Sequence, residues 1–147
     1  MSLLRTGLWL MAFCAAAPAA ALDLPLKQSG GGGFYLDRPE QLPDAFLVDT
    51  GSAYLSLTER SFRALKAQTQ VSLVRHVRGV MADGRRRVVP IYSVSSLTLA
   101  PQCQLKDVEV AVLAGGDRNI LGVSGLKRMQ PFTLAMEPAV LTTAGCH

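Results

Sequence analysis

Phe46-Leu47-Val48-Asp49-Thr50-Gly51-Ser52 carries the strongest structural signal in this chain, because three apolar residues lead an acid directly into a polar turn. An Asp at such a junction can simply be the polar end of a strand, where the chain reaches solvent and turns. The order of the side chains also supports a more specific interpretation. Gly51 has no side chain, so backbone N–H groups can approach the Asp49 carboxylate, and Ser52 can donate a further hydrogen bond. Hydrogen bonds of this kind hold a carboxylate ionised at low pH.

Length and composition indicate an ordinary globular protein. The 147 residues suffice for one domain with a buried core. Hydrophobic residues make up 49% of the chain and charged residues 18%, which argues against intrinsic disorder. The formal net charge of +4 is too small to indicate a nucleic-acid-binding protein.

Residues 1–21 have the pattern of a secretory signal peptide. Arg5 precedes an apolar run at 7–17, and small residues at Ala19 and Ala21 fit a cleavage site near Ala21. The alternative is an uncleaved membrane anchor, although the run is short for a bilayer of about 30 Å, which takes about 20 residues to cross. We therefore expect a secreted or periplasmic protein, with a membrane-anchored form facing the periplasm as the alternative.

Two cysteines, Cys103 and Cys146, lie outside the N-terminal segment. An even pair in an oxidising compartment predicts one disulfide, which would fix the C-terminal tail. Two free buried thiols are the alternative. The chain has no Cys-x-x-Cys motif and no His-rich spacing, so we expect no metal site and no cofactor.

The rest of the chain reads as a series of short strands, so we expect an all-β domain over residues 34–147. Residues 22–33 end in four glycines and are expected to form a flexible lead-in. Thr58 is expected to cap a short helix, and residues 123–129 to form another. The expected strands are 34–37, 45–48, 54–57, 71–81, 85–94, 94–99, 105–113 and 132–141.

A β-hairpin is expected where runs 71–81 and 85–94 flank the turn Ala82-Asp83-Gly84, because Asp-Gly is the strongest short-range hairpin signal. Five arginines make this hairpin strongly basic: Arg75, Arg78, Arg85, Arg86 and Arg87. Such residues usually form a solvated strand edge that prevents aggregation. The alternative is that they select acidic substrates.

Asp49-Thr50-Gly51-Ser52 behind an apolar strand resembles the active-site turn of the aspartic proteases, the family of pepsin and the retroviral proteases. Ile120-Leu121-Gly122, before a short helix, resembles the family's hydrophobic-hydrophobic-Gly segment, which packs beneath the catalytic turn. The hairpin at Ala82-Asp83-Gly84 falls where the family keeps its flap, the mobile arm that closes over the substrate. A buried strand entering a helix and a surface hairpin are the plain alternatives. The pattern is most similar to the small bacterial retropepsin-like branch, over roughly residues 26–136.

This resemblance implies a small closed β-barrel of the retropepsin type, with one or two short helices and a flap hairpin. It also implies an aspartic endopeptidase acting on polypeptide substrates. That chemistry needs two carboxylates facing each other over a water molecule. The chain has a single Asp-Thr-Gly, so we expect a homodimer with one Asp49 from each subunit at the two-fold axis. The resemblance further suggests that the Thr50 side chains brace the two turns, whereas the tail with Cys146 has no expected counterpart.

A serine hydrolase and a non-catalytic domain are the alternative functions. A serine hydrolase would need more than Gly122-Val123-Ser124-Gly125, which lacks the Gly-x-Ser-x-Gly motif, and the chain offers only His76 and His147 as bases. A non-catalytic secreted β-domain that keeps the protease fold and binds peptides stays open as the alternative. A membrane partner is expected only if the N-terminal segment is retained.

Overall fold

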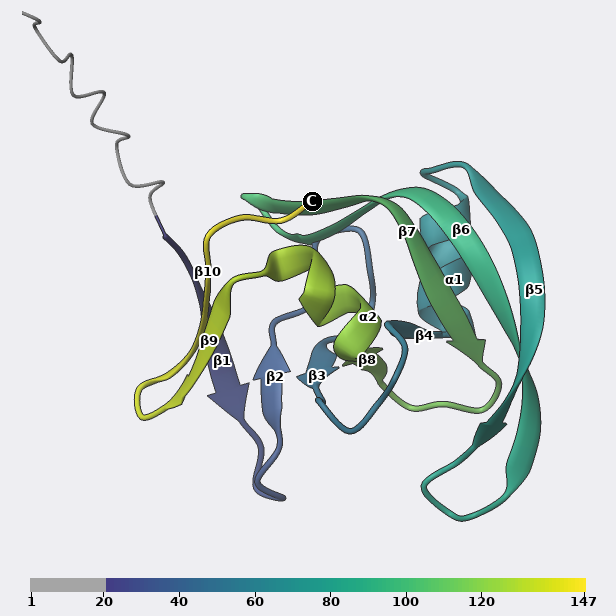
Figure 1. Ribbon diagram of the computed structural model, residues 1–147, viewed down its shortest axis with the longest axis horizontal. Helices are drawn as coiled ribbons and strands as arrows, with labels where there is room; N and C mark the ends of the chain where they lie inside the picture. Colours follow the sequence, from purple (N-terminus) through teal and green to yellow (C-terminus); the bar gives the residue numbers. More distant parts are fainter. Residues whose placement is uncertain (1–20) are drawn as a thin grey trace, which may run out of the picture.

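The computed structural model describes residues 21–147 (Figure 1). The expected signal peptide lies, except for Ala21, outside this part of the chain. The elements are β1 (Leu22–Gln28), β2 (Phe34–Leu36), β3 (Phe46–Val48), β4 (Ser56–Thr58), α1 (Glu59–Lys66), β5 (Val71–Val80), β6 (Arg86–Ala100), β7 (Cys103–Leu113), β8 (Asn119–Leu121), α2 (Val123–Leu126), the 3-10 turn η1 (Lys127–Met129), β9 (Phe132–Met136) and β10 (Ala139–Thr143). Among these helices, none is long and apolar enough to cross a membrane.

Within residues 21–147, ten strands form one sheet in the order β5-β6-β7-β4-β8-β3-β2-β1-β10-β9. The expectation of an all-β domain with short helices is confirmed. The expectation of a closed barrel is wrong, because the ladder ends at β5 on one side and at β9 on the other. These two edge strands lie at opposite ends of the molecule in Figure 1, so they cannot pair and close the sheet.

The N-terminal part of the expected flexible lead-in is a strand. β1 pairs antiparallel with β10 and with β2. Leu24 and Leu26 alternate into the core, where they are 3% and 8% exposed, and this burial stabilises the strand. Only the glycine-rich part forms a turn, which is closed by a hydrogen bond from Ser29 N to Gly33 O of 2.8 Å. The four glycines therefore mark the β1–β2 turn and not a loose segment.

The centre of the sheet positions the acidic turn. β3 pairs antiparallel with β2 and parallel with β8, with Phe46 opposite Asn119 and Val48 opposite Leu121. Phe46 and Leu121 are fully buried, so the apolar run before the acid is anchored in the core. The expected helix cap is confirmed, since the Thr58 side chain accepts a hydrogen bond from Ser61 N at the start of α1.

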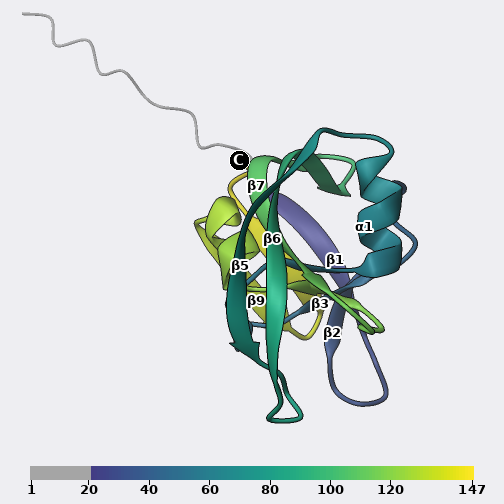
Figure 2. The ribbon, with the colours of Figure 1, turned by 90° about the vertical axis from the view of Figure 1, so that its right-hand side faces the viewer.

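The expected hairpin is also confirmed. β5 and β6 pair antiparallel from Val71 opposite Val94 to Val80 opposite Arg86. β6 then continues without a break to Ala100, so the two strands expected at 85–94 and 94–99 are one. The tip of this hairpin extends beyond the rest of the sheet in Figure 2.

The C-terminal region is held by the predicted disulfide. Cys103 and Cys146 are bonded, with their Cα atoms 5.2 Å apart. The expected strand at 132–141 is instead a hairpin of β9 and β10, because the chain turns at Glu137 and Pro138. The backbone N–H of His147 donates to the Arg128 carbonyl at 3.0 Å, so the tail is fixed against η1.

Candidate active site

Asp49 follows β3 directly, and its position is set by the backbone of β8. Its N–H donates to the Leu121 carbonyl at 3.2 Å, which extends the β3–β8 pairing by one residue. The chain then turns, and the turn hydrogen-bonds the carboxylate. Gly51 N donates to Oδ1 at 2.8 Å, and Ser52 Oγ donates to Oδ2 at 2.7 Å. Both carboxylate oxygens therefore have a donor from the acid's own turn, as the sequence predicts.

The outer side of this turn is open. Thr50 and Gly51 are exposed, whereas Asp49 and Ser52 are partly buried. A Cβ atom on Gly51 would lie 3.1 Å from Asp49 Oδ1, which is a tight contact, so the absence of a side chain favours the close approach of the backbone to the carboxylate. The acid is fixed by hydrogen bonds from its own turn and lies beside exposed residues that another molecule can reach.

The Ile120-Leu121-Gly122 segment lies against the turn, as expected. Val123 N and Ser124 N, just after it, donate to the carbonyls of Ser52 and Ala53 at 2.8 and 3.0 Å. A Cβ atom on Gly122 would lie 2.3 Å from the Tyr54 carbonyl oxygen, a distance that no real contact tolerates. A glycine is therefore required for this close approach.

Ser124, the serine that a serine hydrolase would use as its nucleophile, makes a structural hydrogen bond. Its Oγ accepts the hydrogen bond from Leu55 N at 2.8 Å. His76 lies on β5 and His147 at the C-terminus, so neither belongs to the helix or loop that carries this hydroxyl. The hydroxyl helps hold α2 against the chain that leaves the acidic turn.

The flap-like hairpin turns one face toward the segment that follows the acid. Its tip is a turn in which Gly84 N donates to the Met81 carbonyl at 2.9 Å and Gly84 adopts a φ of 77°. Ala82 and Asp83 complete this tip. On the inner face, Val89 and Ile91 are buried and pack with Tyr54, which lies a few residues beyond the acid.

Comparison with known families identifies the chain. Residues 40–128 match the model of a family described as gag-polyprotein putative aspartyl protease. The match spans more than half of the chain and includes the acidic turn, the hairpin and Ile120-Leu121-Gly122. This chain belongs to that family.

Comparison of this aspartyl protease family member with solved structures shows its fold. It resembles the crystal structure of a retropepsin-like aspartic protease from Rickettsia conorii, with a TM-score of 0.59 and 20% sequence identity. The similarity covers 84% of this chain and 92% of the other. The expected retropepsin-like fold is confirmed. No curated protein matches the sequence.

The sequence did not predict a polar cluster at the other end of β3 in this family member. The Asp44 carboxylate is buried and accepts hydrogen bonds from Thr58 Oγ1 at 2.7 Å and Ser61 Oγ at 2.9 Å. Arg60 forms an ion pair with it. Asn119, on β8, donates to the Asp44 carbonyl at 2.9 Å and accepts from Thr58 N at 3.0 Å. The helix cap was recognisable from the sequence, but nothing local indicates that an acid in an earlier loop accepts from the capping hydroxyl.

The charge of Asp44 is favoured by these contacts. Burial raises the pKa of Asp44, but the hydrogen bonds from Arg60, Thr58 and Ser61 outweigh burial and hold the pKa below its ordinary value. The cluster joins the loop before β3 to the start of α1 and to β8, so it fixes both central strands that support the acidic turn.

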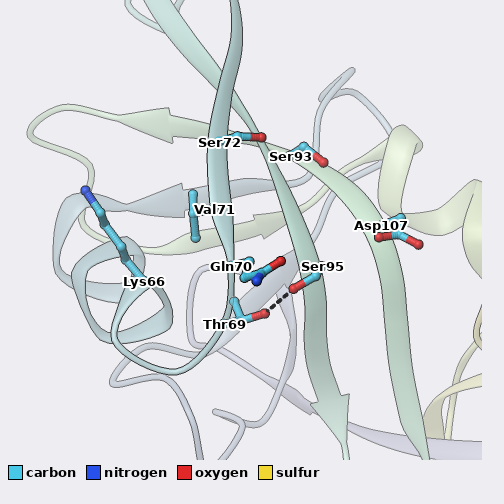
Figure 3. Close-up of a pocket in the computed structure, with 8 residues that line it drawn as sticks. All are labelled: Lys66, Thr69, Gln70, Val71, Ser72, Ser93, Ser95 and Asp107. Carbon is cyan, nitrogen blue, oxygen red and sulfur yellow. Dashed lines mark hydrogen bonds between the residues drawn. The ribbon is translucent and has the colours of Figure 1, made fainter.

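Two surface hollows of this family member lie away from Asp49. One hollow has a volume of about 590 Å³ and lies between the end of α1 and strands β5 to β7. Figure 3 shows the residues that line it: Lys66, Thr69, Gln70, Val71, Ser72, Ser93, Ser95 and Asp107. A second, more apolar groove of about 560 Å³ lies between β1, β2 and the β6–β7 turn. Neither hollow includes the acid. Within residues 21–147, no group of three or more His, Cys, Asp or Glu residues is arranged to hold a metal ion.

Proposed function

We propose that this chain is an aspartic endopeptidase, which hydrolyses peptide bonds with a water molecule held between the Asp49 carboxylates of a homodimer. The observation that carries the proposal is the pair of hydrogen bonds from Gly51 N and Ser52 Oγ to the two Asp49 oxygens. These bonds fix the plane of the carboxylate while leaving its outer side accessible. Membership of the aspartyl protease family and the retropepsin-like fold support the same chemistry.

The reaction needs two acids in different protonation states. The ionised carboxylate takes a proton from the water as the water attacks the scissile carbonyl carbon. The protonated carboxyl donates a hydrogen bond to the carbonyl oxygen, where negative charge develops. Two like charges this close cannot both be ionised easily, so the pair titrates as a unit and shares one proton.

The second acid is proposed to come from a second copy of the chain. The sequence contains one Asp-Thr-Gly, and a two-fold axis beside the turn would bring the two Asp49 residues together. The exposure of Thr50 and Gly51 supports this placement, because these residues would be covered at the axis. Thr50 is then positioned to brace one turn against the other.

The hairpin is proposed to act as the flap. Its tip, Ala82-Asp83-Gly84, extends beyond the sheet, and its inner face packs near the acidic turn through Tyr54. A peptide lying between this face and the two acids would be shielded from water by the hairpin. We also propose a secreted or periplasmic location, which the disulfide between Cys103 and Cys146 supports.

The test compares Asp49→Asn with a matched change elsewhere. Asp107→Asn removes the same charge from an exposed residue with a φ of 46°, a conformation that Asn also tolerates. Cleavage of an unfolded protein substrate is measured from acidic to near-neutral pH. Asp49→Asn is expected to lower cleavage by roughly 100-fold to 10,000-fold, the range for loss of a general acid–base group. Asp107→Asn is expected to cleave like the wild type.

Two results would overturn the proposal. One is equal cleavage by Asp49→Asn and wild type, and the other is no cleavage by the wild type over the whole pH range. A wild-type protein that binds peptides without cleaving them would instead support a non-catalytic peptide-binding domain.

A further inference from the structure

The two faces of the flap hairpin differ in what they contact. On β6, Val89 and Ile91 are 6% and 0% exposed and face the side that packs with Tyr54. Side chains alternate along a strand, so Arg87 lies on this inner face, whereas Arg86 and Val88 lie on the outer face. Val88 is 64% exposed, which agrees with an outer face that is open to solvent.

Two of the five hairpin arginines have a charged partner, and two others lie on the outer face. Arg75, also on the inner face, makes a two-bond ion pair with Glu109, at 2.7 and 2.6 Å. Arg85, at the tip, pairs with Asp83 at 3.1 Å. The remaining pair, Arg78 and Arg86, lie on the outer face, where their cross-strand neighbours are Val88 and Val80.

Arg87 is different. Like Arg78 and Arg86, it takes part in none of the ion pairs found among residues 21–147, but it lies on the inner face of the hairpin. Its Nη1 donates to the Ala114 carbonyl at 3.1 Å, a neutral acceptor that orients the guanidinium without neutralising its charge. Its cross-strand neighbour is Gly79, which has no side chain to cover it. An oriented and uncompensated cation therefore lies on the face of the hairpin that packs with Tyr54, a few residues beyond the acidic turn.

We propose that Arg87 binds the carboxylate of an acidic side chain in the substrate peptide, so that the site prefers peptides containing Glu or Asp. This inference rests on the proposed function, in which the hairpin closes over the peptide. The guanidinium presents parallel N–H donors that match a carboxylate, and Arg87 is exposed, so a substrate side chain can reach it. In a symmetric dimer each subunit supplies one Arg87, so the preference applies on both sides of the scissile bond.

Binding provides the test, so that the result does not depend on catalysis. Fluorescence anisotropy is measured with the Asp49→Asn protein and labelled extended peptides in which each Glu is replaced by Gln, one position at a time. At the favoured positions, Glu peptides are expected to bind about tenfold tighter than their Gln counterparts, as for a charge-assisted hydrogen-bonded pair. Adding Arg87→Ala is expected to bring this ratio close to one.

Arg86→Ala is the matched control, because it removes the same charge from the adjacent residue on the opposite face. It is expected to keep the Glu-to-Gln ratio of the parent protein. Arg87→Lys keeps the charge but loses the paired donors, so its ratio is expected to be intermediate. Circular dichroism verifies that each variant is folded.

Three results would overturn the inference: an unchanged ratio in Arg87→Ala, an equal loss in Arg86→Ala, or no binding of any peptide. Cleavage by the protein with an intact Asp49 is measured in parallel. Cleavage without a preference for acidic residues would refute the role of Arg87 and leave the proposed function standing. An Arg87-dependent preference in binding without any cleavage would support the role of Arg87 and refute the proposed function.

Discussion

The two ends of β3 each carry an acid, and the two acids are held in opposite ways. Asp44, before the strand, is buried and accepts hydrogen bonds from Thr58, at the end of β4, and from α1, which also supplies a guanidinium. Asp49, after the strand, takes its donors from its own turn and is only partly buried. No ion pair involves Asp49 among residues 21–147.

This difference separates a structural acid from a candidate catalytic acid. The first has its hydrogen-bonding capacity used by the fold, and its counter-charge is already in place. The second is rigidly oriented but has capacity left for a water molecule or for a second carboxyl group. The residue type is the same at both ends, so the function lies in what surrounds each carboxylate.

Gly122→Ala is expected to have the largest effect, because it disrupts the packing of the acidic turn at the Asp49 end of β3. The new methyl group would lie 2.3 Å from the Tyr54 carbonyl oxygen and 2.7 Å from that of Ser52, so the backbone of this segment would have to shift. We expect a loss of about 3 kcal/mol in unfolding free energy, together with the loss of cleavage, because the turn is displaced. Chemical denaturation measures the first and a protein-substrate assay the second.

Gly30→Ala is the control for this change, since a Cβ atom there meets nothing within 4 Å. It is expected to behave like the wild type. A Gly122→Ala protein with wild-type stability and activity would show that the close approach of α2 to the acidic turn is not needed.

Asp44→Asn disrupts the polar cluster at the other end of β3. We expect it to have a smaller effect on stability and no effect on cleavage. Loss of the charge weakens the hydrogen bonds from Thr58, Ser61 and Arg60, and we expect unfolding free energy to fall by about 2 kcal/mol. The folded variant is expected to retain cleavage. A variant with wild-type stability but no cleavage would reverse the roles that we assign to the two acids.

The pH dependence of stability gives this prediction a second readout. The pKa of folded Asp44 lies below its ordinary value of 3.8, so the stabilisation is present above that value and is lost as the pH falls through the folded pKa. Wild type is therefore expected to lose its advantage over Asp44→Asn below about pH 4. Denaturation curves at neutral and strongly acidic pH measure this convergence, and a constant difference would contradict it.

Glu109→Gln tests an exposed carboxylate for comparison with buried Asp44, and we expect it to have the smallest effect on stability. Glu109 and Arg75 pair closely, but their side chains are 40% and 43% exposed, so solvent screens the interaction. We expect a much smaller loss of stability than for Asp44→Asn, and one that disappears at high salt concentration. A loss as large as that of Asp44→Asn, measured by the same denaturation curves, would show that exposure does not determine how much these carboxylates contribute to stability.

The sequence was most informative where the signal is local. The acidic turn, the Asp-Gly hairpin, the Thr58 cap and the cysteine pair each depend on neighbouring residues or on simple counting, and the structure contains all four. The turn could be predicted down to its donors, because Gly51 and Ser52 lie within three residues of the carboxylate that they contact.

The sequence was least informative where distant segments meet. The Asp44 cluster joins residues up to 75 positions apart, and β1 depends on strands from both ends of the described chain. The glycines after β1 concealed its apolar alternation. The sheet was expected to close, yet closure depends on where both edge strands end, which no local pattern specifies.

The most direct test of the central claim is to mix wild-type and Asp49→Asn chains in equal amounts, refold them together and measure cleavage at constant total chain concentration. If each active site needs one Asp49 from each of two subunits, only dimers of two wild-type chains cleave, and activity falls to about one quarter of that of wild type alone. If each chain acts by itself, activity falls to about one half, and that result would contradict the account.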